Sequence, residues 1–185
     1  VETEEDIREF LAADLSKVSD GSELTDMEKG VSIIQDAIAA GKHIRIIGDY
    51  DVDGVTSTYI LYKGLIGLHA KCDKFIPHRI KDGYGLHENA IRRAREDGVE
   101  VILTCDNGIA AADAISLAKE FGMTVVVTDH HEVPFVQEPD GRRYILPAAD
   151  AVIDPKRPED HVFKEICGAV VAWKFTGRLY KRFGF

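Results

Sequence analysis

The chain has 185 residues, of which 45% are hydrophobic, and it carries a formal net charge of −9. That length is typical of a single domain with a sizeable core, and no apolar run approaches the roughly eighteen residues of a membrane span. The acidic balance argues against a simple basic surface for nucleic acid, although acids that hold metal ions present a positive site once loaded.

The N-terminal segment, residues 1–24, is predicted to be peripheral. A weak helical pattern at Ile7, Phe10, Leu11 and Leu15 indicates one short helix followed by a loop. The acidic start has no signal-peptide character, and the first residue is Val1, which is typical of a piece of a longer protein. Three widely spaced cysteines without a CxxC pair indicate a reducing, cytoplasmic setting, where we expect all three to be small buried hydrophobes: Cys72, Cys105 and Cys167.

Residues 25–185 are predicted to form one domain in which strands and helices alternate. Thr25 and Glu28 have the spacing of a capping box, and the helix that follows is expected to end at Gly41. Because the strands read as continuous apolar runs, the fold class is α/β, a doubly wound, mainly parallel five-stranded sheet with helices on both faces. Residues 132–150 are the one long irregular connection, either an excursion or a mobile loop. Strands are predicted at 44–47, 72–76, 101–104, 124–128 and 151–153, and further helices at 55–66, 88–96, 110–121 and 165–183.

Acidic residues follow four of these strands, where ligands of open α/β sheets bind. A single aspartate such as Asp53 or Asp106 could simply cap the next helix. Helix capping does not account for the whole set, because carboxylates gathered in one crevice repel one another and need cations. No lysine or arginine lies inside these motifs, so metal ions are the expected cations. Oxygen ligands with one or two imidazoles suit Mn²⁺ or Mg²⁺, and we expect two ions with a shared carboxylate. The strand ends read Gly48-Asp49-Tyr50-Asp51-Val52-Asp53-Gly54, Asp106-Asn107-Gly108, Asp129-His130-His131 and Asp154-Pro155.

The ordered set of motifs over about residues 25–180 resembles the DHH domain of RecJ-type single-stranded-DNA exonucleases, in the DHH phosphoesterase superfamily. Asp129-His130-His131 is similar to the triplet that names the superfamily. Asp154 stands where many relatives carry asparagine, so the position departs in identity but keeps an oxygen ligand. The other matching stretches are 49–57, 105–109, 77–86 and 163–172.

The resemblance implies a role for each position of the site. Asp51, with Asp49 beside it, would hold the first metal, Asp106 would bridge, and Asp53, His130 and Asp154 would hold the second. His131 would face the scissile phosphate, so that His131 and Asp106 are the catalytic candidates, and Asp129 would orient His130 through its ring N–H. Three residues would bind substrate: Arg79 through a phosphate, Tyr84 by stacking on a base, and Gly168 through backbone N–H groups at a helix N-terminus.

The resemblance implies a metal-dependent hydrolase that degrades single-stranded DNA from the 5′ end in DNA repair and recombination, with replication or repair proteins as candidate partners. One alternative is a DHH-family phosphoesterase acting on short oligonucleotides or cyclic dinucleotides. Such relatives usually open the first motif with a histidine, which the segment Ile46–Asp49 lacks. A second alternative is a replication scaffold of the family that has lost its metal ligands. RecJ relatives also place a second, substrate-binding domain after the DHH domain, and we expect it to be absent from this chain.

Overall fold

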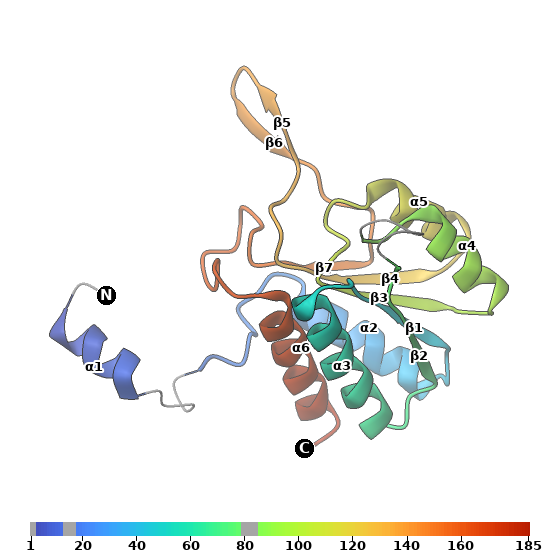
Figure 1. Cartoon of the computed structure of the whole chain (residues 1–185), viewed down its shortest axis with the longest axis horizontal. Coiled ribbons are helices and arrows are strands. Elements are labelled where there is room, and N and C mark those ends of the chain that lie inside the picture. The colour runs from blue at the N-terminus through green and yellow to red at the C-terminus, as the bar shows by residue number, and fades with distance from the viewer. Residues whose placement is uncertain (1–2, 13–17, 79–84) are drawn as a thin grey trace.

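The computed structural model describes residues 3–12, 18–78 and 85–185. Five strands form one parallel sheet in the spatial order β2-β1-β3-β4-β7, which confirms the predicted fold class (Figure 1). β1, β3 and β4 are buried along almost their whole length, which is why apolar residues dominate their sequences, and the charged residue among them, Arg45 of β1, pairs with Asp73 and Asp97. The strands are β1 (Ile44–Ile47), β2 (Cys72–Phe75), β3 (Val101–Cys105), β4 (Thr124–Thr128) and β7 (Ala151–Ile153).

Helices cover both faces of the sheet, and successive strand residues point to opposite sides. On one face, Ile46, Leu103 and Val126 pack against α2 (Met27–Ala39), α3 (Val52–Gly67) and α6 (Gly168–Arg182). On the other face, Ile47 and Ile102 pack against α4 (Glu88–Glu96) and α5 (Ala112–Glu120). The sheet therefore lies between two hydrophobic cores, with helices on both of its faces (Figure 1).

The predicted capping box at the start of α2 is wrong. The cap position belongs to Asp26, whose backbone is left-handed with φ 61°. Thr25 donates both its backbone N–H and its hydroxyl to Asp160 Oδ1, at 2.9 and 2.8 Å, and Glu28 accepts a hydrogen bond from Arg178 on α6. These partners are far away in sequence, so local spacing could not reveal them. At the other end of α2, Gly41 has φ 66° and stops the helix as predicted.

The connection 132–150 is an excursion that contains an antiparallel hairpin, which the sequence analysis did not predict. β5 (Phe135–Glu138) pairs with β6 (Gly141–Tyr144), and the hairpin projects away from the sheet (Figure 1). The rings of Phe135 and Tyr144 lie 6.0 Å apart, and Arg142 lies 4.3 Å from the centre of the Phe135 ring. Both strands are exposed, so no buried stripe marked them in the sequence.

α1 (Glu4–Ala12) is the predicted N-terminal helix, and Ile7 and Leu11 on it are exposed. Figure 1 shows it to one side of the sheet and its covering helices. None of the described helices combines the length and the apolar character that crossing a bilayer requires.

Two glycines in helices allow a matched test of the packing. A Cβ atom at Gly30 in α2 would lie 2.7 Å from Ile153 Cδ1, whereas one at Gly177 in α6 would meet nothing within 4 Å. Gly177→Ala should therefore raise the free energy of unfolding by roughly 1 kcal/mol, because alanine is the better helix former. Gly30→Ala should lower it by about 1–3 kcal/mol through overpacking. Urea denaturation of both variants measures the two effects, and equal signs would contradict this account of the α2 interface.

Candidate metal centre

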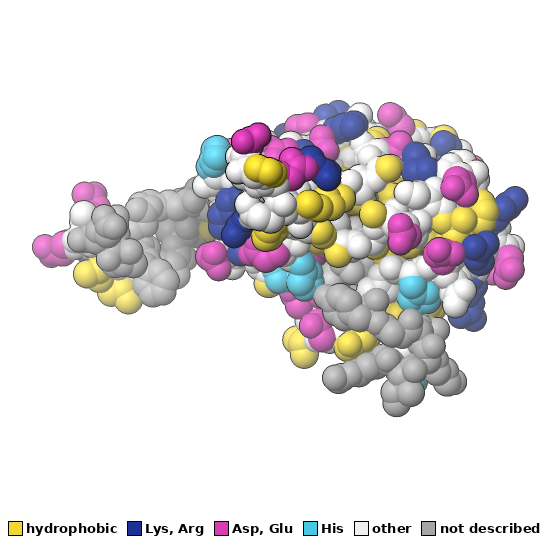
Figure 2. All heavy atoms as spheres, turned by 90° about the horizontal axis from the view of Figure 1, so that it is seen from above, with side chains coloured by type: hydrophobic (Ala, Val, Ile, Leu, Met, Phe, Trp, Pro, Cys, Tyr) yellow, Lys and Arg dark blue, Asp and Glu magenta, His cyan; other side chains and the backbone are white. Residues whose placement is uncertain are grey.

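The acidic and histidine residues meet at the carboxyl-terminal edge of the sheet. β1 leads into Asp49, β3 into Asp106, and β4 into Asp129, His130 and His131. Figure 2 views the molecule from the side toward which the hairpin projects, and it shows histidines next to acidic side chains on this face. Parallel strands thus bring together residues that lie far apart in sequence.

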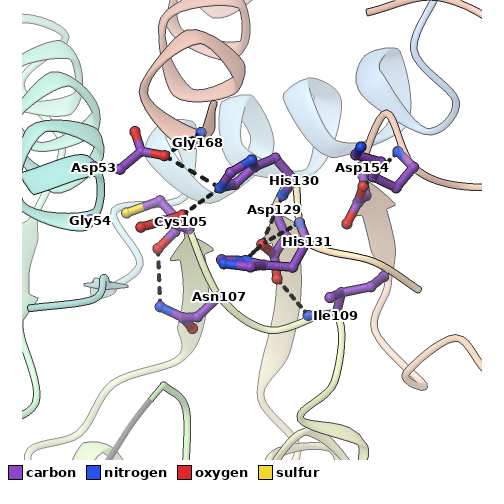
Figure 3. Close-up of polar contacts among 12 residues, drawn as sticks. Asp53, Gly54, Cys105, Asn107, Ile109, Asp129, His130, His131, Asp154 and Gly168 are labelled. Carbon is purple, nitrogen blue, oxygen red and sulfur yellow. Dashed lines mark hydrogen bonds and ion pairs between the residues drawn. The ribbon is translucent and has the colours of Figure 1, made fainter. Parts of the chain in front are cut away.

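His130 is in contact with two carboxylates, and Figure 3 shows the contact with Asp53. Its Nε2 atom is 3.0 Å from Asp106 Oδ1 and 3.3 Å from Asp53 Oδ2. Asp106 has a left-handed backbone, with φ 58°, which aspartate and asparagine tolerate better than most residues. Gly168 lies so close that a Cβ atom there would be 2.9 Å from Asp106 Oδ1, so a side chain at 168 would press on this carboxylate.

Asp51 and Asp53 lie at the start of α3 but have different partners. Asp51 caps α3, because its Oδ1 atom accepts the Gly54 N–H at 2.9 Å. Asp53 binds the start of α6, since its two oxygens accept the N–H groups of Gly168 and Ala169 at 2.7 and 2.8 Å (Figure 3). The Gly168 N–H is bound to Asp53 in this structure, and its expected contact with a phosphate stays a prediction.

Asp129 is almost fully buried and organises the residues around it. Its Oδ1 atom is 2.7 Å from His131 Nδ1 and accepts the His130 N–H at 2.7 Å, while Oδ2 accepts the Ile109 N–H at 2.9 Å (Figure 3). The carboxylate thus contacts the ring of His131, whereas the sequence analysis assigned it to the ring of His130. This hydrogen bond raises the pKa of His131 to about 9, so its imidazolium form is favoured at neutral pH.

Burial and like charge make the ionised carboxylates costly. Burial, together with the neighbouring Asp53 and Asp51, raises the pKa of Asp106 to about 8. Burial also raises the pKa of Asp49, and neither oxygen of that side chain accepts a hydrogen bond of normal geometry from the described residues. Buried oxygens without donors, among carboxylates that repel one another, are what a cation would satisfy.

In the described part of the chain, the candidate ligand atoms fall into two groups that share one carboxylate. Asp49, Asp51 and Asp106 each offer an atom within 4.8 Å of the others, and so do Asp106, His130 and His131. Two adjacent ion positions bridged by Asp106 fit this arrangement, and the oxygen and imidazole donors suit Mn²⁺ or Mg²⁺. His131 joins the second group although the sequence analysis expected it to face substrate only.

Asp154 belongs to neither group. It is fully buried at the end of β7, and its Oδ1 atom accepts the Lys156 N–H at 2.8 Å, while Oδ2 has no hydrogen-bond partner among the described residues. Burial, followed by the charge of Asp129, raises the pKa of Asp154 to about 7. Its role as a ligand stays a prediction, as do the roles of Arg79 and Tyr84, which lie outside the described residues.

Asn107 and Cys105, to which the sequence analysis gave no role in the site, lie next to the ligands. Asn107 donates from Nδ2 to the carbonyl oxygens of Ile47 and Cys105, at 3.2 and 3.0 Å, and so links β1 to β3. Cys105 is fully buried, which raises the pKa of its thiol to about 12. A protonated thiol is a poor metal ligand, so the site still favours hard cations over thiolate-binding ones.

Cys72 is only partly buried and Cys167 is exposed, so the expectation that all three cysteines are buried is wrong.

Comparison with known proteins agrees with this geometry. Residues 43–183 match the DHH family, N-terminal domain. The chain is 40% identical over 179 residues to the single-stranded-DNA-specific exonuclease RecJ of Bacillus subtilis, a match over 96% of this chain and 22% of that protein. RecJ of Escherichia coli is 35% identical over 153 residues, covering 82% of this chain and 25% of the relative. The chain thus spans about a quarter or less of the length of these relatives.

Solved structures show the same likeness. A crystal structure of exonuclease RecJ bound to manganese superposes with a TM-score of 0.75 and 32% identity, covering 88% of this chain and 39% of that one. RecJ of Thermus thermophilus in complex with Mn²⁺ gives a TM-score of 0.67 and 30% identity, over 88% of this chain and 22% of the other. The family match, the sheet order and the clustered acids and histidines agree, and the chain belongs to the DHH family.

Proposed function

We propose that the chain carries the metal centre of a two-metal phosphodiesterase that hydrolyses single-stranded DNA from the 5′ end. The observation that carries this proposal is the pair of ligand groups that share Asp106. Relatives named single-stranded-DNA-specific exonuclease RecJ support the substrate, and RecJ structures bound to Mn²⁺ support the cofactor. DNA repair is the setting that such an activity serves, with a cytoplasmic location and repair or replication proteins as partners.

In this mechanism, the chain's own residues hold the ions and the reacting phosphate. Asp49, Asp51 and Asp106 would hold one ion, and Asp106 and His130 the other. Asp53, whose Oδ2 atom lies 3.3 Å from His130 Nε2, would join the second ion by releasing an N–H group at the start of α6. Ions of this kind, when bound, supply an activated water and neutralise charge on the phosphate. Asp154 would add its unpartnered Oδ2 atom to the second ion, with some rearrangement of the site.

His131 is the proposed acid. Asp129 holds the ring through Nδ1, and the raised pKa keeps a proton available at neutral pH. Two hollows flank this residue, one lined by Leu86 and Ile109 and the other by Lys156, so His131 lies where a strand would pass. From there the imidazolium can stabilise the phosphate and donate a proton to the leaving oxygen.

The scaffold alternative has less support than the enzyme. Among the described residues, acids or histidines whose ligand atoms lie within 4.8 Å of one another follow β1, β3 and β4, although not β7. The short-oligonucleotide alternative differs in the length of its substrate. Rates on single strands of two, five and twenty nucleotides, with Mn²⁺ present, discriminate between the two. A preference for the shortest would contradict the exonuclease proposal.

The bridging role of Asp106 predicts opposite effects of one substitution with and without metal. Because its pKa is raised above the ordinary value, Asp106 destabilises the metal-free fold at every pH above that value. Asp106→Asn, which suits the left-handed backbone, should raise the metal-free Tm by roughly 4–8 °C, which corresponds to about 2 kcal/mol. It should also abolish the further rise that Mn²⁺ causes in the unsubstituted chain.

Thermal unfolding in EDTA and in Mn²⁺ measures both effects. The control is Asp36→Asn, which replaces an exposed aspartate on α2 and should change neither value appreciably. If Asp106→Asn retained the full stabilisation by Mn²⁺, Asp106 would not be a bridging ligand.

The two histidines should separate metal binding from turnover. His130→Ala removes a ligand, so Mn²⁺ affinity should fall by at least roughly 10-fold to 100-fold. That is the usual cost of losing only the hydrogen-bond partner of a ligand. His131→Ala should largely keep metal affinity and lower the cleavage rate about 100-fold to 10,000-fold. Calorimetric Mn²⁺ titration, beside cleavage of 5′-labelled single strands, tests the pair. Equal loss of metal in both variants would make His131 a ligand rather than an acid.

A further inference from the structure

One of the hollows beside His131 is lined by two lysines, and none of the roles above uses either of them. This hollow has a volume of about 360 Å³, and its lining includes His130, His131, Lys156 and Lys164 together with Glu132 and Glu165. The two histidines belong to the metal centre, so the lysines lie next to the place where the scissile phosphate is proposed to bind.

The two lysines differ in how they are held. Lys164 Nζ donates to the carbonyl oxygen of Arg157 at 2.8 Å, which makes it part of the loop structure. Lys156 Nζ lies 3.4 Å from Glu132 Oε1 and 3.6 Å from Glu165 Oε1, distances longer than a good hydrogen bond. The two glutamates are 85% and 92% exposed, and pairs with such exposed carboxylates are worth little.

The backbone of Lys156 is fixed although its charge is loosely paired. Its N–H donates to Asp154 Oδ1 at 2.8 Å, directly after β7, so the lysine starts from a buried and ordered point. Its side chain is only 20% exposed, so an anion entering the hollow would meet an ammonium group that is partly shielded from water. Partial shielding strengthens such a contact relative to one at the open surface.

We infer that Lys156 binds the phosphate next to the scissile one in a single strand, exchanging its contacts with Glu132 and Glu165 for that phosphate. The inference rests on the proposed function, because it takes the scissile phosphate to lie at the metal centre. It adds one fixed positive contact in a chain of net charge −9, at the point where the strand leaves the ions.

Binding of a short strand tests this inference directly. The probe is a 5′-phosphorylated tetrathymidylate, with Ca²⁺ in place of Mn²⁺ to slow hydrolysis, measured by fluorescence anisotropy over a range of salt concentrations. Lys156→Met should weaken binding about 5-fold to 10-fold at low salt and reduce the slope of log K against log salt by about 0.7, the value for one contact with a single strand. Lys156→Arg should retain most of the affinity.

The matched control is Lys42→Met. Lys42 is also partly buried, but it precedes β1 at the opposite edge of the sheet, so its loss should leave affinity and slope unchanged. A second series places one neutral methylphosphonate at each internucleotide linkage in turn. At one linkage the replacement should weaken binding to the unsubstituted chain but not to Lys156→Met, which identifies the contacted phosphate.

The outcomes separate the two claims. If the unsubstituted chain binds the strand in a metal-dependent way but Lys156→Met leaves the salt slope and every methylphosphonate effect unchanged, the inference is wrong and the proposed function stands. If the unsubstituted chain shows neither stabilisation by Mn²⁺ nor metal-dependent binding of the strand, the proposed function fails and the inference fails with it.

Discussion

Repulsion among buried carboxylates is the constraint on which this structure depends. Asp49, Asp106, Asp129 and Asp154 are all at most 2% exposed, yet they gather at one edge of one sheet. The fold offsets part of the cost with backbone donors and with the positive charge of His131, whose pKa is raised. The start of α6 takes up the charge of Asp53 in the same way. The remaining repulsion is concentrated in the two ligand groups around Asp106. A bound cation would relieve it, and this relief favours cation binding there.

Much of this arrangement could be predicted from sequence because it depends on local patterns. Short, mainly apolar segments that alternate with helices identified the five strands, although β2 contains Asp73 and Lys74. A residue that directly follows a parallel strand must lie at the carboxyl-terminal edge of the sheet. The meeting of Asp106 and His130 followed from that rule, and they lie 3.0 Å apart. Glycines such as Gly41 also predicted where helices end, because a left-handed residue after a helix depends only on that residue and its immediate neighbours.

The parts that escaped prediction are contacts between distant segments. Spacing alone could not tell which histidine ring Asp129 would contact, because adjacent residues after a strand differ only in the direction of their side chains. Thr25 had a local partner in the sequence pattern, but Asp160 from the far end of the chain replaced it. Asp53 likewise binds the N-terminus of a helix that begins more than a hundred residues later. In each case tertiary geometry supplied a better partner than the nearest residue of the right type.

The order of strands in the sheet has a consequence for folding. β1 and β3, and β3 and β4, are neighbours in the sheet that are separated along the chain by helices, and such non-local pairing forms slowly. The ligands come from the ends of these strands, so they are assembled only when the sheet is nearly complete. An ion that recognises the assembled set stabilises the native state and little that precedes it. Bound metal would then protect the protein by slowing its unfolding, while the rate at which the chain folds would be left to the sheet itself.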